Sequence, residues 1–298
     1  MLALGRTMKA VPDEAWRNDD GSFEPAARSA AASPAVPMGQ AVNANGDAVI
    51  DRLGARLGHA LAVRLPLRTV AMRNRRPLLS FTFDDFPASA HATGAGLIEA
   101  RGARGTFFAC TSQLGTAQEH WTVAGPDAVG DLHRRGHEIG LHTHSHRPVF
   151  NMTAAEFEAD LAANKAALRQ LVPGLRHETF AYPFGFASMG RKRQLGRLAR
   201  ASRSVQPGIN AGRLDPDFIK AVELIDCGLT QIRLDSLLDE TVARRGWLVF
   251  LTHDVAPQPT KFGASPGLMN AALDGALRRS IEILPMRDAL DQIGLDES

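Results

Sequence analysis

Apolar runs and amphipathic segments alternate along residues 77–290. Short runs rich in β-branched and aromatic residues predict buried strands, and longer segments with apolar residues three or four apart predict helices. Strands are expected at 77–83, 105–110, 137–141, 179–181, 202–205, 220–225 and 247–251, and helices at 94–101, 127–135, 153–171, 191–200, 233–244 and 268–281. This alternation predicts an α/β fold with a parallel sheet, open or closed into a barrel, in which chemistry lies at the C-terminal ends of the strands.

The N-terminal region has a different pattern. Residues 1–46 contain many alanines and prolines with no period of 2 or 3.6, which predicts an extended or disordered arm, or a strap over the domain or a partner subunit. Apolar positions at helical spacing predict an amphipathic helix over 49–65, ended by Pro66. We therefore expect an arm over 1–46 and one domain over 47–298, with oligomerisation possible through the arm or the helix.

Composition limits the classes of function. The chain has 298 residues and a formal charge of +2, which argues against a nucleic-acid partner, and no apolar run is long enough for a transmembrane segment. Cys110 and Cys227 cannot form a disulfide framework and are expected in the core. The start lacks a signal-peptide pattern, so a cytoplasmic location is expected, although a leader cleaved beforehand would leave the same pattern.

Ionisable residues follow three of the predicted strands. Asp84-Asp85 ends the first, His142, His144 and His146 follow another, and His253-Asp254 follows 247–251. Carboxylate and imidazole ligands suit zinc or a similar divalent ion, and an open site of this kind serves hydrolysis. Two structural readings compete: Asp85 is a helix N-cap, and the histidines belong to a surface loop.

Four sequence motifs carry a resemblance to a known family. They are Ser80-Phe81-Thr82-Phe83-Asp84-Asp85, the run Gly136 to His146, Phe180-Ala181-Tyr182-Pro183-Phe184-Gly185 and Leu251-Thr252-His253-Asp254. In this order they resemble the motifs of the polysaccharide deacetylase family, the NodB-homology carbohydrate esterases, over about residues 78–290. The resemblance implies a distorted (β/α) barrel with a groove at the C-terminal ends of its strands. It also implies metal-dependent removal of N-acetyl groups from a glycan.

The resemblance implies a metal site and a catalytic base. It makes Asp84 the base, and it makes Asp85, His142 and His146 the ligands of a divalent metal, most often Zn²⁺. His144, between the two histidine ligands, is not expected to bind the metal, because it would point elsewhere if the segment were a turn of helix.

The resemblance implies further roles around the substrate. The backbone N–H of Phe184, after Pro183, would help to hold the oxyanion. His253 would protonate the departing amine, and Leu251 would line the pocket for the acetyl methyl. Asp226 is the best positional candidate for an aspartate that tunes His253.

One residue departs from the family pattern. Many family members carry an arginine at the position of Ala181, where it orients the catalytic aspartate; here another group must substitute, or the strand and metal site alone hold Asp84. Two alternative functions stay open: a metal hydrolase of the same fold acting on another amide, and a glycan-binding relative without turnover. The resemblance to this family favours a role in exopolysaccharide or adhesin biosynthesis.

Overall fold

The computed structural model describes residues 58–295. The helix predicted over 49–65 is helical at 58–64, and its earlier part lies outside the described residues, as does the predicted arm over 1–46. Within the described part, no helix combines the length and the apolar character needed to cross a bilayer.

The centre of the domain is an eight-stranded sheet in which every pairing is parallel. Its order is β6-β5-β4-β3-β2-β9-β8, and β10 pairs with the first half of β2. The bounds are β2 Leu78–Phe83, β3 Thr106–Ala109, β4 Glu138–Leu141, β5 Thr179–Ala181, β6 Ala201–Arg203, β8 Val222–Glu223, β9 Trp247–Thr252 and β10 Glu282–Ile283. The sheet is curled into a half-barrel whose row of strands ends at β6 and β8. A separate antiparallel pair joins β1 Val70–Ala71 to β7 Arg213–Leu214.

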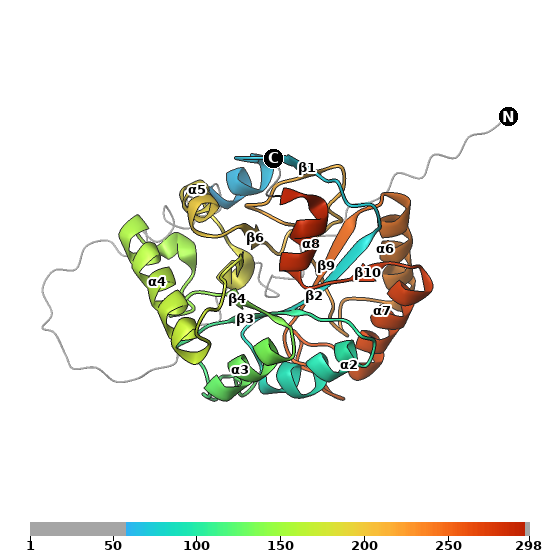
Figure 1. Ribbon diagram of the computed structural model, residues 1–298, viewed down its shortest axis with the longest axis horizontal. Helices are drawn as coiled ribbons and strands as arrows, with labels where there is room; N and C mark the ends of the chain where they lie inside the picture. Colours follow the sequence, from blue (N-terminus) through green and yellow to red (C-terminus); the bar gives the residue numbers. More distant parts are fainter. Residues whose placement is uncertain (1–57, 296–298) are drawn as a thin grey trace, which may run out of the picture. The chain divides into compact units, whose positions relative to one another are not determined.

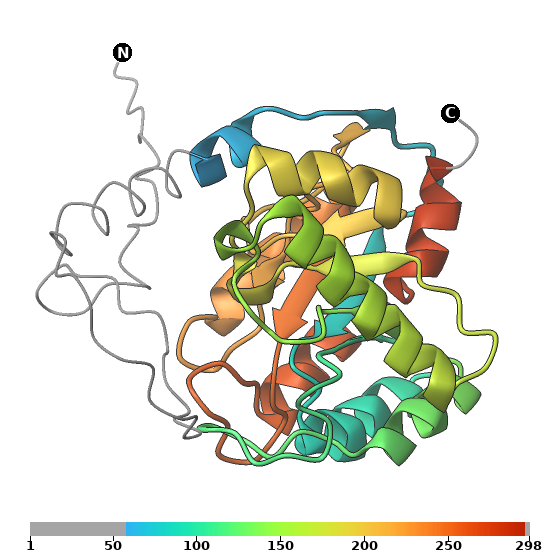
Figure 2. The same cartoon turned by 90° about the vertical axis from the view of Figure 1, so that its left-hand side faces the viewer.

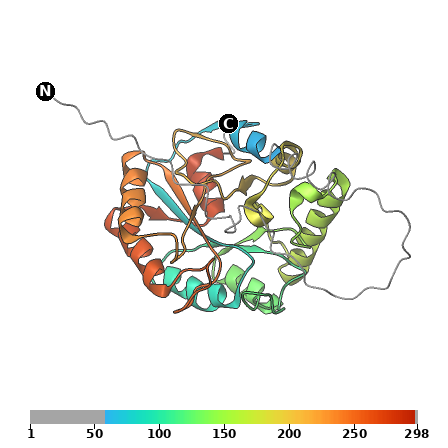
Figure 3. The same cartoon turned by 180° about the vertical axis from the view of Figure 1, so that it is seen from behind.

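Helices surround the sheet (Figure 1) and form the same ring when seen from behind (Figure 3). Figure 2 shows α4 and α5 beside each other on one side. The bounds are α2 Ala95–Glu99, α3 Pro126–Arg134, α4 Ala154–Leu171, α5 Met189–Leu198, α6 Gln231–Ala243, α7 Pro266–Arg278 and α8 Met286–Ile293, with a π-helical turn at Ala90–Gly94 and 3₁₀ turns at Val149–Asn151 and Pro183–Gly185. A capping box of Thr153 and Glu156 begins α4.

The central strands are buried on both faces. All six residues of β2 and all six of β9 are buried, as expected of parallel strands covered by helices. Phe83 stacks on Phe107 with ring centroids 4.6 Å apart. Gly140 in β4 packs so closely on Phe108 that a Cβ would lie 2.4 Å from that ring, so the position admits only glycine.

Some elements differ from the sequence prediction. The strand expected at 220–225 is only two residues long in β8, and the two-residue strands β1, β7 and β10 carry too little periodicity to be predicted. The amphipathic helix α8 was not predicted either. Cys110 is buried as expected, but the expectation for Cys227 is wrong: it is exposed in the turn after β8. There its thiol donates a hydrogen bond to the Lys261 carbonyl.

Left-handed backbone is concentrated where the strands end. Five of the seven described non-glycine residues with positive φ are Asp85, Phe86, Thr143, His146 and Phe184, each directly after β2, β4 or β5. Such conformations cost about 1–3 kcal/mol each and persist where the surrounding structure enforces them. Strained backbone is therefore concentrated at the edge of the sheet where the sequence also places its ionisable groups.

Candidate metal and catalytic site

Asp85, His142 and His146 converge at the C-terminal edge of the sheet. The Nε2 atoms of His142 and His146 lie 3.2 and 2.8 Å from Asp85 Oδ1, and the three ligating atoms lie within 4.8 Å of one another. Tetrahedral zinc with bonds near 2.0–2.2 Å holds neighbouring ligand atoms about 3.3 Å apart, so this spacing suits a small divalent ion. The residues that the resemblance assigned to the metal are thus brought together.

Contacts behind the imidazoles orient them. His142 Nδ1 lies 2.9 Å from the carbonyl oxygen of Ala181, so an Nδ1–H donated to it leaves the Nε2 lone pair facing Asp85. The backbone N–H of His142 points to Asn164 Oδ1 at 3.3 Å, and that of His146 donates to Thr143 Oγ1 at 3.1 Å. Both rings are held with their free nitrogens toward one point.

The electrostatics of the trio favour a bound cation. Burial opposes ionisation of Asp85, but the positive charge of His146 and contacts with both imidazoles outweigh it, and the pKa of this carboxyl is well below its usual value. Asp85 Oδ1 is buried, and no well-formed hydrogen bond satisfies it among the described residues. A buried carboxylate oxygen facing two imidazole nitrogens is a donor set that fits zinc or a similar ion.

Asp84 points to a different partner. Its carboxylate, like the guanidinium of Arg203, is buried, and Arg203 Nη2 donates to both of its oxygens. Arg203 is the last residue of β6, two strands away from the metal ligands of β4. The catalytic base expected at Asp84 is therefore held by a buried ion pair.

Arg203 provides the positive charge beside Asp84 that Ala181 cannot provide. In the parallel pairing of β5 with β6, Ala181 and Arg203 are register partners. A guanidinium reaches the aspartate from the neighbouring strand, and the small Ala181 side chain stands where many family members have the arginine. The Arg203 guanidinium also lies 5.3 Å above the Phe108 ring, whose position depends on Gly140.

His253 faces the same site from the end of β9. Its Nε2 lies 4.0 Å from Asp85 Oδ2, and its Nδ1 lies 3.2 Å from the carbonyl oxygen of Phe262. Trp121 stacks on the imidazole at 5.2 Å, and the Phe262 ring lies 5.6 Å away. These contacts hold the ring with Nε2 toward the metal ligands.

The structure does not bring Asp226 to His253. Asp226 is exposed, and its Oδ1 accepts a hydrogen bond from the backbone N–H of Ser265, the N-cap of α7. A carboxylate whose charge interacts with that of His253 is Glu223, the register partner of Leu251 in β9. Burial raises the pKa of Glu223, and the charges of His253 and Arg203 lower it, so this side chain interacts with both.

The remaining predicted residues lie around this constellation. Leu251 is buried in β9, and Pro183 is buried at the start of the turn after β5. Phe184 is 41% exposed with φ 58°, and its ring lies 4.7 Å from that of His146. The turn therefore places the Phe184 backbone beside a metal ligand.

Of the two competing structural readings, the N-cap role for Asp85 is not observed, and the histidines do follow a loop, but one in which His142 is buried. Ser89 is the N-cap residue of the helical segment that follows Asp85. His144 turns away from the metal ligands and pairs through Nδ1 with Thr111 Oγ1 at 2.9 Å. The reason differs from the expected one: residues 142–146 are not a helical turn but an irregular loop with left-handed Thr143 and His146.

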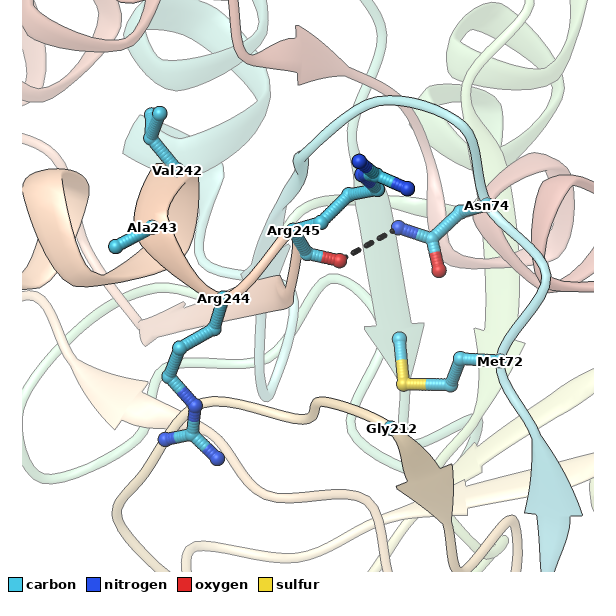
Figure 4. A pocket seen from close by; sticks show the side chains of 7 residues that line it. All are labelled: Met72, Asn74, Gly212, Val242, Ala243, Arg244 and Arg245. Atoms are coloured by element: carbon cyan, nitrogen blue, oxygen red, sulfur yellow. Dashed lines mark hydrogen bonds between the residues drawn. The ribbon is translucent and has the colours of Figure 1, made fainter.

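Two cavities in the described part of the chain lie away from this site. Figure 4 shows one of about 370 Å³ lined by residues such as Met72, Asn74 and Arg245, in which the Asn74 amide donates to the Arg245 carbonyl. None of its lining residues belongs to the metal site. The cluster of polar side chains at the strand ends therefore marks the site.

Sequence reasoning missed Arg203, Glu223 and Trp121. An arginine inside a predicted buried strand is unusual unless it is paired, and with Ala181 lacking the expected cation this was the available signal for Arg203. Glu223 and Trp121 lie on a short strand and an irregular loop, and no sequence spacing indicates their distance from His253.

The fold and site define a class: an α/β protein with a candidate divalent-metal site at the C-terminal edge of a curled parallel sheet. Residues 71–198 match the family described as polysaccharide deacetylase. This part of the chain is therefore similar to a polysaccharide deacetylase domain, which supports the predicted carbohydrate-deacetylating hydrolase class, and the predicted NodB-type fold is confirmed.

Solved structures share this fold. A chitin deacetylase from the fungus Colletotrichum lindemuthianum is 16% identical with a TM-score of 0.55, covering 74% of this chain and 89% of that one. A family 4 carbohydrate esterase from Bacillus anthracis is 11% identical with a TM-score of 0.52, covering 75% and 86%. A family 4 acetyl xylan esterase from Clostridium thermocellum, solved with a cobalt ion, is 17% identical with a TM-score of 0.51, covering 72% and 90%. A search of curated proteins finds no match.

Proposed function

We propose that the protein is a metal-dependent N-deacetylase that hydrolyses acetamido groups on an N-acetylated poly- or oligosaccharide. The observation that carries the proposal is the trio of half-buried Asp85, buried His142 and half-buried His146 beside an independently paired Asp84. A metal site alone would suit binding, whereas a second carboxylate outside the ligand set provides a base.

Each group of site residues would have a separate role in hydrolysis. A divalent ion, Zn²⁺ in our proposal, would supply an activated water and polarise the acetamide carbonyl when bound to Asp85, His142 and His146. Asp84, oriented by Arg203, would accept the proton of the attacking water. His253 would give a proton to the amide nitrogen as the C–N bond breaks, so that acetate and the amino sugar leave.

The surroundings of the reacting atoms fit this division. The Phe184 N–H would donate to the developing oxyanion, a contribution of about 2.7–4 kcal/mol for a well-placed donor. Leu251 and Pro183 would bound the space for the acetyl methyl. We also propose an exopolysaccharide or adhesin precursor as the substrate, on the family resemblance given above, and a cytoplasmic site of action.

Acetate release tests the proposal. Purified protein loaded with zinc should release acetate from N-acetylglucosamine oligomers and leave free amines on the sugars. Small cyclic amides and oligomers acylated with groups larger than acetyl serve as the comparison. Faster turnover of either comparison substrate would favour the hydrolase of another amide, and binding of oligomers without acetate release would favour the non-catalytic relative.

A further inference from the structure

A basic and apolar surface lies on the side of the domain away from the sheet, where residues 58–69 meet α5. Residues 64–69 are all exposed, with Leu65 at 49% and Leu67 at 36% exposure. Arginines flank these leucines in the sequence, and two more project from α5. We call the six residues the basic–apolar patch: Arg64, Leu65, Leu67, Arg68, Arg193 and Arg197.

Buried contacts fix the two segments against each other. Lys192 of α5 is fully buried, and its Nζ donates to the carbonyl oxygens of Ala62 at 2.7 Å and Leu65 at 3.0 Å. The same ammonium pairs with Asp215 at 2.5 Å. Figure 2 shows the segment that starts at residue 58 lying against α5. The patch is therefore a rigid surface, not a chance meeting of two loops.

A shallow pocket of about 300 Å³ lies within the patch, lined by Leu67, Arg68, Arg193, Gly196, Arg197 and Asp217. Asp217 is buried and is neutralised by Arg68, whose Nε and Nη2 lie 3.0 and 2.9 Å from its Oδ1. Arg193 and Arg197 are exposed one helical turn apart, and in the described part of the chain neither side chain has an ion pair or hydrogen bond. The pocket thus carries uncompensated positive charge.

We propose that the basic–apolar patch binds the surface of an anionic lipid bilayer, with a lipid phosphate between Arg193 and Arg197 and with Leu65 and Leu67 inserted among the acyl chains. Arginine heads at headgroup level beside apolar side chains are the pattern of an interfacial binding surface. This docking does not depend on the proposed activity.

Other occupants fit the patch less well. A symmetric contact with a second copy would place the arginines of both copies against each other, which like-charge repulsion disfavours. A soluble polyanion would use the arginines but would leave Leu65 and Leu67 in water, where two neighbouring exposed leucines gain nothing. A bilayer uses both kinds of side chain.

Vesicle co-sedimentation of the full chain tests the proposal. Protein should sediment with vesicles made of phosphatidylcholine and phosphatidylglycerol in equal parts but not with phosphatidylcholine alone, and added NaCl should release it. Arg193→Gln with Arg197→Gln should weaken binding about thirtyfold, since each arginine near an anionic surface contributes about 1 kcal/mol. Leu65→Ser with Leu67→Ser should weaken it at least about tenfold.

A matched control lies on α6, across the sheet from α5 in Figure 1. Ile232 is 85% exposed and Arg233 is exposed, so Ile232→Ser with Arg233→Gln removes the same chemistry elsewhere and should bind vesicles as the wild type does. Thermal unfolding should match among all these variants, because every altered side chain is exposed.

Several results would overturn the proposal. Equal binding to both kinds of vesicle would remove the electrostatic argument, and wild-type binding by both patch variants would place the contact elsewhere, residues 1–57 included. Full displacement by heparin, combined with unaffected binding of the leucine variant, would assign the arginines to a soluble polyanion. A dimer in sedimentation velocity that the patch variants dissociate would assign the surface to a second copy.

Discussion

Replacement of Arg203 by alanine should disable the catalytic base while sparing the metal ligands. Both members of the Arg203–Asp84 pair are buried, so the variant leaves a carboxylate without its cation in the interior. Breaking a buried ion pair on one side costs about 3–5 kcal/mol. For a domain of this size we expect Tm to fall by roughly 10 °C.

The loss of activity should exceed what lowered stability explains. At a temperature where the variant remains folded, a base displaced by about 1 Å reduces turnover roughly 100-fold. Bound zinc, measured by mass spectrometry of the folded protein, should stay at the wild-type level, because Asp85, His142 and His146 do not touch Arg203. The assay is acetate release from N-acetylglucosamine oligomers, with kcat and KM determined separately, and kcat should carry the loss.

Two further variants separate charge from position. Arg203→Lys keeps the positive charge but loses the guanidinium, whose Nη2 binds both carboxylate oxygens of Asp84 while Nη1 donates to the Ser204 carbonyl oxygen, so it should recover only part of kcat. In Ala181→Arg with Arg203→Ala, the guanidinium moves to the register partner on β5, and most of the lost activity should return. If activity recovers when the guanidinium is moved from β6 to β5, Asp84 requires a nearby positive charge but does not require that it come from β6.

The control is an ion pair remote from the site. Arg200 pairs with Glu178 at 2.9 Å and with Asp291 at 2.5 Å near the opposite ends of the strands, so Arg200→Ala should lower Tm without lowering kcat. Wild-type kcat in Arg203→Ala would refute the positioning role. A loss of zinc that parallels the loss of activity would show that the arginine acts through the metal site instead.

The remaining predictions concern three other regions. Glu223→Gln should lower kcat about tenfold, which is about 1.4 kcal/mol, because it removes a charge that interacts with His253. Asp226→Asn should leave kcat unchanged. The reverse outcome would show that Asp226 is the carboxylate that acts on His253. Partial burial lowers the pKa of His177 from 6.5 to about 4, so the folded state keeps the ring neutral and stability should fall as pH drops through that interval. The loss should be about 1 kcal/mol at this half-buried ring, and urea titrations of His177→Gln should lack it. Burial raises the pKa of Cys110 to about 12, so a thiol reagent should label only exposed Cys227 before unfolding, and labelling of two thiols would contradict the described core.

The long elements were predictable because their residues repeat a period. The six-residue runs that form β2 and β9 are mainly apolar, and α4 has a capping box and buries Phe157, Leu161 and Leu168 at helical spacing. The two-residue strands offer no period, so β1, β7 and β10 are formed by tertiary pairing that the sequence does not display.

The candidate metal ligands could be predicted from the sequence, whereas the residues that support the site could not. Asp85, His142 and His146 stand in motifs of fixed spacing at strand ends. Arg203 and Glu223 act across strands, and their partners are set by sheet register, which places Arg203 beside Ala181 and Glu223 beside Leu251. Asp226 was chosen by its place in the sequence, and it lies three residues after Glu223, whose charge interacts with that of His253.

The central claim is that Asp84 performs the chemistry beside a metal that it does not hold. The most direct test measures bound zinc and acetate release together in the wild type and in Asp84→Asn, at the same protein concentration and with N-acetylglucosamine oligomers. We predict equal zinc in both proteins and acetate from the wild type alone. Acetate release at the wild-type rate by Asp84→Asn, with its zinc retained, would contradict the account.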